Sequence, residues 1–238
     1  MQTEDLLRIE GLKGGYGGTP VLQGIDLSIH AGEIVAVIGR NGMGKTTLMR
    51  SLMGLVSASE GTVHFGGSDI TALNTDLRAR MGIGYIPQGR DVFPELSVTE
   101  NLIVGEQARE DRASAADYQR IYEFFPILLE RAGQPAGTLS GGQQQQLAIA
   151  RAMISNPRLM LFDEPSEGIQ PSIIKDIARH IIKLNADTGV SVCLVEQNLD
   201  LIVSIAQRGY VLDKGRVVAQ LNKDEIRDQS VVRSYLSL

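Results

Sequence analysis

The sequence has few of the residues on which several classes of protein depend. Its single cysteine, Cys193, excludes a disulfide framework, and the apolar run 190–195 around it predicts a buried, unreactive thiol. The three histidines, His30, His64 and His180, lack the spacing of metal ligands, which favours structural or surface roles. No apolar run approaches the ~20 residues that are needed to cross a lipid bilayer.

Positive charge is scarce as well. The chain has 23 Lys and Arg against 28 Asp and Glu, and this net charge of −5 argues against general electrostatic binding to nucleic acid. Residues 1–5 are acidic and no apolar segment follows them, so we expect no signal peptide. The 238 residues, 43% of them hydrophobic, are enough for one large domain with an inserted lobe. These features indicate a globular protein of the cytoplasm.

Short apolar runs that alternate with helical patterns are what the sequence does contain. The runs 34–38, 159–162 and 190–195 predict buried strands, and their alternation with helices implies a mainly parallel sheet in an α/β fold. Residues 6–30 predict short strands separated by glycine turns, and the largely helical segment from about 97 to 155 predicts a lobe inserted into the core. Further helices are expected at 45–55, 98–107, 115–125, 140–155 and 171–186, and further strands at 63–65, 83–86, 210–212 and 217–220.

The segment from Gly39 to Thr46 fits the pattern G-x-x-x-x-G-K-[ST] without a mismatch, between a predicted strand and a predicted helix. In such a loop, glycines let backbone N–H groups point at phosphate oxygens. Lys45 would then contact the β- and γ-phosphates, and the Thr46 hydroxyl would bind Mg²⁺. A glycine turn that happens to precede a helix is the alternative, and the flanking elements argue against it.

Two acids follow the buried strand 159–162. In a protein with a phosphate-binding loop, a strand that ends in aspartate places that carboxylate near Mg²⁺, which makes Asp163 the candidate metal ligand. Glu164 lies one residue further on, where it would act as general base toward the attacking water. A solvated acidic turn is the alternative, and it would be favoured if the phosphate-binding loop were missing.

A second candidate for anion binding lies far downstream. Ser140, Gly141, Gly142 and Gln143 open a predicted helix. The first N–H groups of a helix have no partner inside it, and the helix dipole adds partial positive charge there. The chain therefore carries two phosphate-binding elements of different design.

Together these motifs resemble those of the ATP-binding cassette (ABC) ATPases, and they occur in that family's order. Residues 39–46 match the Walker A motif, 139–143 match the LSGGQ signature letter for letter, and 159–163 match Walker B. Gln88 matches the Q-loop glutamine, and Tyr16 matches the aromatic residue that stacks on adenine. The resemblance covers essentially the whole chain and implies that it binds ATP and Mg²⁺.

The resemblance also implies the fold. It leads us to expect an α/β P-loop NTPase core with a mainly parallel sheet, an N-terminal antiparallel β region and an inserted α-helical subdomain. Residues 6–238 would form a single ABC ATPase domain. Within it, residues 1–88 and 156–238 would form the nucleotide-binding core, and about 89–155 the helical subdomain that carries the signature.

The roles of individual residues follow from the same resemblance. ATP would be bound by Tyr16, Gly39, Asn41, Gly42, Gly44, Lys45, Thr46 and Thr47, and by the signature residues Ser140, Gly141, Gly142 and Gln143. Mg²⁺ would be held by Thr46, Gln88 and Asp163, and the catalytic residues would be Glu164, Gln197 and Gln88. In this family two cassettes pair head to tail, so that the signature of one caps the ATP held by the Walker A motif of the other. A single chain thus holds two half-sites.

Two positions depart from the family pattern. Gln197 stands where many members have a switch histidine, and glutamine can hydrogen-bond a phosphate or water but cannot carry the imidazolium charge. The D-loop segment 167–170 ends in Gln170 where the family usually has aspartate. Both changes bear on how well this chain's own site hydrolyses ATP. Because Glu164 is present, we expect hydrolysis.

Short strings of residues narrow the subfamily. Residues 195–198 and 85–93 resemble the ATPases of branched-chain amino acid importers, and 164–174 are most similar to the urea-importer branch of that group. The partners implied are a second ABC ATPase subunit, two membrane permeases at the cytoplasmic face of the cell membrane and, indirectly, a periplasmic solute-binding protein, with no nucleic acid. Phe93 and Leu96 would either meet a permease as exposed apolar groups or pack inside the helical lobe.

The leading functional hypothesis is therefore an ATP-hydrolysing importer subunit that drives uptake of urea, short-chain amides or branched-chain amino acids. One alternative is a soluble mechanical ABC ATPase that acts on nucleic acid or ribosomes. Such relatives usually carry a long coiled-coil insertion or two cassettes in one chain, and this chain has neither. Another alternative, suggested by Gln197 and Gln170, is a nucleotide-sensing subunit that hydrolyses ATP weakly.

Overall fold

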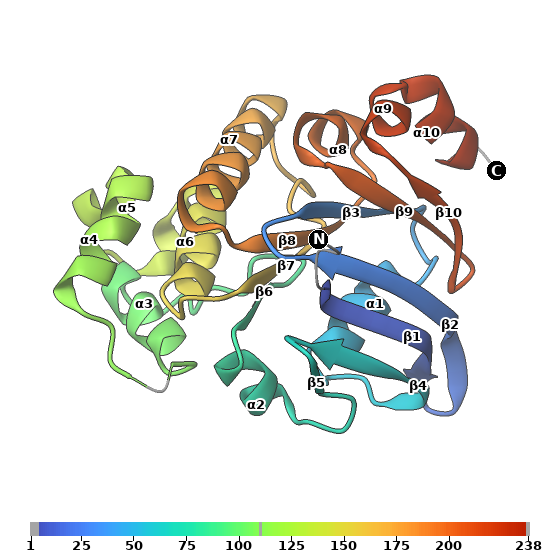
Figure 1. Cartoon of the computed structure of the whole chain (residues 1–238). Helices are drawn as coiled ribbons and strands as arrows, with labels where there is room; N and C mark the ends of the chain where they lie inside the picture. The colour runs from blue at the N-terminus through green and yellow to red at the C-terminus, as the bar shows by residue number, and fades with distance from the viewer. Residues whose placement is uncertain (1–4, 110, 237–238) are drawn as a thin grey trace.

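The computed structural model of the chain describes residues 5–109 and 111–236. Residues 1–4, from which the expectation of no signal peptide largely comes, lie outside this part. Over the described residues, none of the helices combines the length and the apolar character that a membrane crossing requires. Two sheets, together with a group of helices to one side, make up the fold (Figure 1).

A six-stranded sheet forms the centre of the molecule, in the order β10-β9-β3-β8-β7-β6. Its strands are β3 (Ile34–Ile38), β6 (Ile83–Ile86), β7 (Leu159–Asp163), β8 (Ser191–Glu196), β9 (Arg208–Asp213) and β10 (Arg216–Leu221). Neighbouring strands are parallel except in the hairpin of β9 and β10. The expectation of a mainly parallel sheet is confirmed.

The side chains of these strands alternate between two hydrophobic cores. In β3, Ile34 and Ile38 belong to one core, whereas Val35 and Val37 belong to the other. Helices cover one face of the sheet, while α1 (Lys45–Leu52) and the second sheet cover the other. Because both faces are buried, the strands appear in the sequence as continuous apolar runs.

The N-terminal region forms an antiparallel sheet in the order β2-β1-β4-β5. Its strands are β1 (Asp5–Tyr16), β2 (Thr19–His30), β4 (Ala58–Phe65) and β5 (Ser68–Asp69). The expectation of several short strands within 6–30 is wrong, because two strands of 12 residues each pair with one another there. Of the glycines that suggested turns, Gly17 and Gly18 form the turn between β1 and β2, whereas Gly14 and Gly15 lie inside β1, where the register shifts between them.

A group of helices lies at one side of the central sheet (green to yellow in Figure 1). Its members are α3 (Val98–Glu106), α4 (Ala115–Phe124), α5 (Pro126–Glu130) and α6 (Gly141–Met153). Their apolar side chains join the core on one face of the sheet. Ser97, Ser114 and Ser140 each begin a helix with a capping box, which fixes where α3, α4 and α6 start.

The remaining helices are α2 (Thr75–Arg80), α7 (Pro171–Thr188), α8 (Leu199–Ile205), α9 (Lys223–Arg227) and α10 (Gln229–Leu236). Helices α7 and α8 lie on the face of the sheet opposite α1 (Figure 1). Helices α2, α5 and α8 were not predicted individually from the sequence. Each has at most seven residues, which is too short for the helical period of apolar residues to stand out.

The cysteine and one histidine are packed in the core region. Cys193 lies in β8, fully buried, and burial raises the pKa of its thiol to about 12. His180 lies with its ring 4.9 Å from the ring of Phe125, and burial lowers its pKa. His30 instead pairs with Asp5 at 2.9 Å near the surface. The prediction of a buried, unreactive thiol agrees with this environment.

Candidate functional site

The phosphate-binding loop predicted at 39–46 connects the carboxyl end of β3 to the start of α1. Two of its glycines have the left-handed backbone, with φ of 80° at Gly42 and 104° at Gly44. At Gly39 the reason for glycine is space, because a Cβ would come within 2.5 Å of the Leu212 carbonyl oxygen on β9. The glycines therefore allow a tight loop at a helix N-terminus, which is a suitable place for an anion.

Lys45 is buried at the first turn of α1, with 4% of its surface exposed. Its ammonium donates to the backbone oxygens of Gly39 (2.8 Å) and Arg40 (3.0 Å). It also pairs with the Glu164 carboxylate at 2.9 Å. A buried ammonium is tolerated only where it has such partners, and phosphate oxygens would satisfy the same charge.

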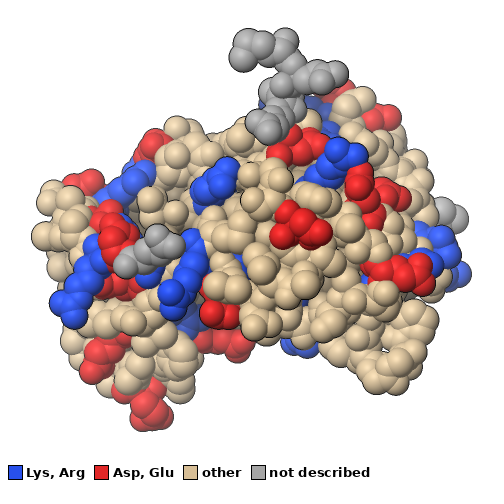
Figure 2. Space-filling view, turned by 60° about the horizontal axis from the view of Figure 1, so that its bottom comes forward, with Lys and Arg blue, Asp and Glu red and all other residues tan. Residues whose placement is uncertain are grey.

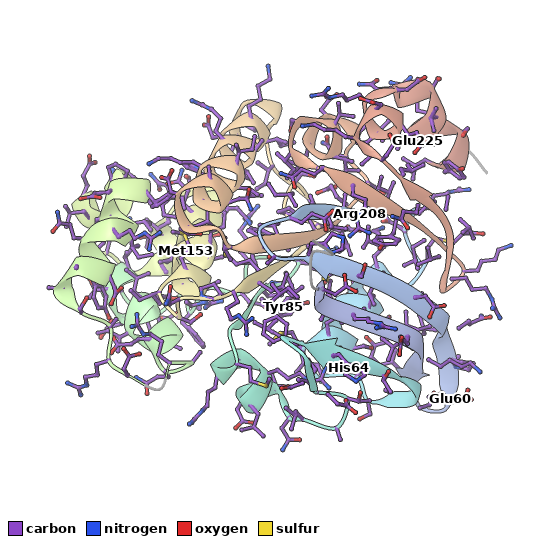
Figure 3. The ribbon with its side chains drawn as sticks, viewed as in Figure 1. Glu60, His64, Tyr85, Met153, Arg208 and Glu225 are labelled. Atoms are coloured by element: carbon purple, nitrogen blue, oxygen red, sulfur yellow. The ribbon has the colours of Figure 1, made fainter. Side chains whose placement is uncertain are left out.

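A carboxylate and two hydroxyls meet at the end of β7. The Thr46 hydroxyl donates to Asp163 Oδ1 at 3.0 Å, and the Tyr85 hydroxyl donates to Asp163 Oδ2 at 3.0 Å (Tyr85 is labelled in Figure 3). Burial raises the pKa of Asp163, although the bonds from Thr46 and Tyr85 act to lower it. Burial and the neighbouring Asp163 raise the pKa of Tyr85. A partly desolvated carboxylate beside a hydroxyl fits Mg²⁺, which prefers oxygen ligands and would stabilise the ionised acid.

Glu164 follows directly in the turn after β7. Its φ is 48°, a left-handed conformation that residues other than glycine rarely adopt. Its N–H donates to the Val195 carbonyl oxygen of β8 at 3.0 Å, while its carboxylate reaches Lys45. Only 1% of Asp163 and 7% of Glu164 are exposed, so neither acid belongs to a solvated turn.

Lys45, Thr46 and Glu164 line one open pocket of ≈ 260 Å³, and Asp163 lies behind Thr46 without lining it. Its lining residues are Val21, Asn41, Gly42, Gly44, Lys45, Thr46, Thr47, Gln88 and Glu164. Gln88 is also tied to the segment after β7, because its Nε2 donates to Glu167 Oε2 at 2.6 Å. Residues distant in the sequence thus form a site that can hold a polyphosphate and a cation next to a carboxylate.

The signature residues lie outside this pocket, at the N-terminus of α6. Gln143 N–H donates to Ser140 Oγ (3.4 Å), and Ser140 N–H donates to Gln143 Oε1 (3.0 Å). Ser140 is exposed, whereas Gly142 is buried against the side chain of Ile173. None of the residues 140–143 is among those that line the phosphate pocket. The structure therefore does not bring the two predicted anion-binding elements together within one chain.

Tyr16 and Gln197 are also absent from the lining of the phosphate pocket. The Tyr16 ring is 46% exposed and lines a second pocket, of ≈ 690 Å³, with Arg50, Tyr85 and Phe93 among its neighbours. A hydrogen bond that the Arg50 guanidinium donates to the Tyr16 hydroxyl raises the pKa of Arg50. Gln197 is exposed just beyond the end of β8. Their predicted contacts with nucleotide remain predictions.

Exposed apolar groups border the second pocket. Phe93 is 44% exposed and Leu55 is 56% exposed, and the Arg151 guanidinium lies 5.1 Å from the centre of the Phe93 ring. Of the two alternatives for Phe93, packing inside the helical lobe is therefore wrong. Leu96 is half-buried.

Two polar groups of this region, Tyr85 and Glu196, were not predicted from the sequence. Glu196 is 1% exposed, ends β8 and accepts hydrogen bonds from Ser166. The signal that identified Asp163, an acid at the carboxyl end of a buried strand, applies equally to Glu196. Tyr85 carries no comparable signal, because its position beside Asp163 depends on the pairing of β6 with β7.

Comparisons with known proteins point to one family. The family model described as ABC transporter matches residues 22–167. The high-affinity branched-chain amino acid transport ATP-binding protein BraG of Pseudomonas aeruginosa is 41% identical over 219 residues, which are 90% of this chain and 94% of that protein. The lipopolysaccharide export system ATP-binding protein LptB of Escherichia coli is 36% identical over 236 residues, 97% of this chain and 96% of that protein. The ADP conformation of MJ1267, an ATP-binding cassette of an ABC transporter, matches with a TM-score of 0.84 at 29% identity, over 98% of this chain and 99% of that one.

Proposed function

Because the chain belongs to the ABC transporter family and is an ATPase subunit of the branched-chain amino acid importer type, we propose that it hydrolyses ATP to drive solute import through separate permeases. The observation that carries this proposal is the pocket in which Lys45, Thr46 and Glu164 meet. Phosphoryl transfer to water requires a cation, a metal ligand and a general base, which are the roles proposed for these three residues in that order.

The roles of the pocket residues follow from their contacts. Bound Mg²⁺ supplies neutralisation of phosphate charge, and Thr46, Asp163 and Gln88 are the groups proposed to hold it. Lys45 would exchange the Glu164 carboxylate for phosphate oxygens. That exchange frees Glu164 to accept the proton of the attacking water.

A second ATPase subunit completes the proposed site. The signature residues Ser140 to Gln143 lie outside the pocket of their own chain, and Ser140 is exposed. A helix N-terminus favours an anion by its free N–H groups and its dipole. We infer that α6 caps a nucleotide held by the phosphate-binding loop of a partner in a head-to-tail dimer, with either an identical or a different ATPase.

The permeases would dock at the second pocket. Phe93 and Leu55 supply exposed apolar area there, and Arg50 and Arg151 supply charge. We treat helices α3 to α6, about 89–155, as a helical subdomain and residues 1–88 and 156–238 as the nucleotide-binding core, so that this pocket lies where the two meet. The chain would be held at the cytoplasmic face of the cell membrane through these permeases, and a solute-binding protein would act indirectly.

The transported solute is proposed to be a branched-chain amino acid, and urea and short-chain amides are the alternative solutes. The similarity to BraG supports the amino acid, and the string at 164–174 supports urea. Nucleic acid has no part in the proposal, in keeping with the interspersed acidic and basic side chains on the face drawn in Figure 2.

Uptake by cells tests the solute. Cells that lack this chain are compared with cells that carry the wild type or Lys45→Ala, using labelled leucine and labelled urea separately. We expect leucine uptake to require the wild-type chain and to be lost in the variant, because Lys45 is the buried cation of the phosphate pocket. If leucine uptake does not depend on this chain but urea uptake does, the solute is urea and not a branched-chain amino acid.

A weakly hydrolysing sensor is the second candidate. It is favoured by Gln197, which lies exposed outside the pocket lining in the place of a titratable histidine. Turnover of ATP by the assembled transporter separates the two functions, since a transport ATPase has a kcat in the usual enzyme range of about 1 to 1,000 per second.

A further inference from the structure

Glu196 is a buried carboxylate to which the proposed mechanism gives no role. It ends β8, and 1% of its surface is exposed. Its Oε1 accepts the N–H groups of Gln197 (2.8 Å) and Asn198 (2.9 Å). Its Oε2 accepts the hydroxyl (2.9 Å) and the N–H (3.3 Å) of Ser166. One side chain thus joins the segment after β7 to the segment after β8.

The two joined segments carry residues of the candidate site. Ser166 belongs to the turn that begins with Glu164, and Gln197 is the first residue beyond β8. The backbone of Glu164 is in the left-handed region, at a φ of 48°, so its conformation has to be imposed by the surroundings. The end of β8 imposes it at two points, through the Val195 carbonyl oxygen and the Glu196 carboxylate.

We propose that Glu196 is a positioning residue for ATP hydrolysis, which sets the turn of Glu164 and the segment of Gln197 in one fixed relation. The inference rests on the proposed role of Glu164 as general base. Hydrogen bonds to an ionised carboxylate are shorter and roughly twice as strong as neutral ones. A displacement of about 1 Å at a reacting group can cost about 100-fold in rate. Glu196 would therefore act on turnover while having no contact with ATP.

Glu196→Gln tests the proposal in the assembled transporter. The glutamine side chain has nearly the same shape as glutamate, but only its amide oxygen can accept hydrogen bonds, whereas both carboxylate oxygens of Glu196 do so. The end beside Gln197 and Asn198 faces two N–H groups, so the amide NH₂ would turn to Ser166, whose hydroxyl can accept instead. The variant thus loosens the turn of Glu164 selectively. We expect kcat to fall about tenfold or more, with the KM for ATP and the Kd for ATP changed by less than about twofold.

Glu33→Gln is the matched control. Glu33 also has a largely buried carboxylate that accepts several bonds, from Arg208 (2.7 and 2.8 Å) and from the His30 N–H (3.0 Å). It precedes β3, at the end of the sheet opposite the phosphate-binding loop. We expect this substitution to lower the midpoint of thermal unfolding and to leave kcat unchanged.

Ser166→Ala removes the other partner and keeps the Glu196 charge. It deletes the hydroxyl bond and leaves the Ser166 N–H bond in place, so we expect kcat to fall about two- to fivefold, with a small fall in melting temperature from the loss of one hydrogen bond to a buried carboxylate. Because both substitutions act through one contact, the fall in kcat of the double variant Glu196→Gln with Ser166→Ala should be smaller than the product of the two single falls. If Glu196→Gln does not fold, Ser166→Ala decides by itself.

Three results would overturn the inference. They are an unchanged kcat in Glu196→Gln, an unchanged kcat in Ser166→Ala, and a double variant whose losses multiply. All three presuppose a wild-type transporter that hydrolyses ATP and loses that activity in Glu164→Gln. A wild type without ATPase activity, or one whose activity survives Glu164→Gln, would instead refute the proposed function and so identify a different failure.

Discussion

The sequence predicts anion binding at two helix N-termini, those of α1 and α6. The two differ in the side chains that surround them. Beside α1 lie a buried lysine and two acids from the end of β7. At the start of α6, Ser140 and Gln143 satisfy one another, and neither residue lines the phosphate pocket. Both ends can attract an anion, and each has a cation nearby, Lys45 at α1 and the Arg90 guanidinium against Gly141 at α6. Among the described residues, only the α1 end combines its cation with acids that can serve as metal ligand and base. We infer from this difference that α1 carries the groups for hydrolysis, whereas α6 acts on a nucleotide outside the pocket of its own chain.

Glu164→Gln gives the largest expected effect, because it removes the base that only the α1 end has. We expect kcat of the assembled transporter to fall about 100- to 10,000-fold, since a neutral amide cannot take a proton. ATP binding by the full chain should persist or tighten, because Lys45 no longer pairs with a competing carboxylate. Phosphate release and ATP Kd measure the two effects. Glu60→Gln, at an exposed site labelled in Figure 3, is the control; undiminished phosphate release by Glu164→Gln would refute the assignment.

Ser140→Arg tests the other end of the comparison. A long cation at the N-cap of α6 breaks the capping box and blocks the approach of a second chain. We expect hydrolysis at the partner's phosphate-binding loop to fall about 100-fold or more, while ATP binding by the isolated chain stays unchanged. Loss of ATP binding by the isolated chain would mean that α6 serves its own site, and the half-site model would be wrong.

Asp163→Asn tests whether the buried Asp163 carboxylate beside α1 lowers the stability of the folded chain. Since burial raises the pKa of Asp163, the ionised carboxylate is unfavourable in the folded chain without a cation. The stability of the wild type should therefore fall as the pH rises through that raised pKa, and Asp163→Asn should lack this loss. Melting temperatures of both proteins without Mg²⁺, at a series of pH values from the ordinary aspartate pKa of about 3.9 upward, measure this difference.

The same variant should bind Mg²⁺ with ATP more weakly, by about tenfold or more, because a charged ligand oxygen is lost. The Mg²⁺ dependence of ATP hydrolysis in the assembled transporter gives this second readout. An unchanged Mg²⁺ dependence would remove Asp163 from the proposed metal ligands, whatever the melting temperatures show.

The sequence predicted those parts of the site that depend on neighbouring residues along the chain. The loop 39–46 and the acids after β7 could be found because a motif and an apolar strand identify them locally. Tyr85 and the ion pair of Lys45 with Glu164 could not, because they arise from the packing of separate strands. The fold shows the same division. The buried strands were predicted closely, whereas residues 6–30 form two long strands in place of several short ones, because β1 continues through Gly14 and Gly15.

A pair of glycine substitutions gives the smallest expected effects and compares the two N-termini most directly. Gly44→Ala places a side chain at a φ of 104°, with its Cβ 3.3 Å from the Leu22 side chain, and should cost about 1 to 3 kcal/mol of stability. Gly142→Ala stays within a helix. Its Cβ would lie 3.0 Å from Cδ1 and 3.1 Å from Cγ2 of Ile173, so that side chain has to move slightly, while alanine favours a helix over glycine by about 1 kcal/mol. Its net effect should thus be within about 1 kcal/mol. Denaturant unfolding of both variants measures the difference; equal losses would show that backbone geometry does not distinguish the loop before α1 from the capped start of α6.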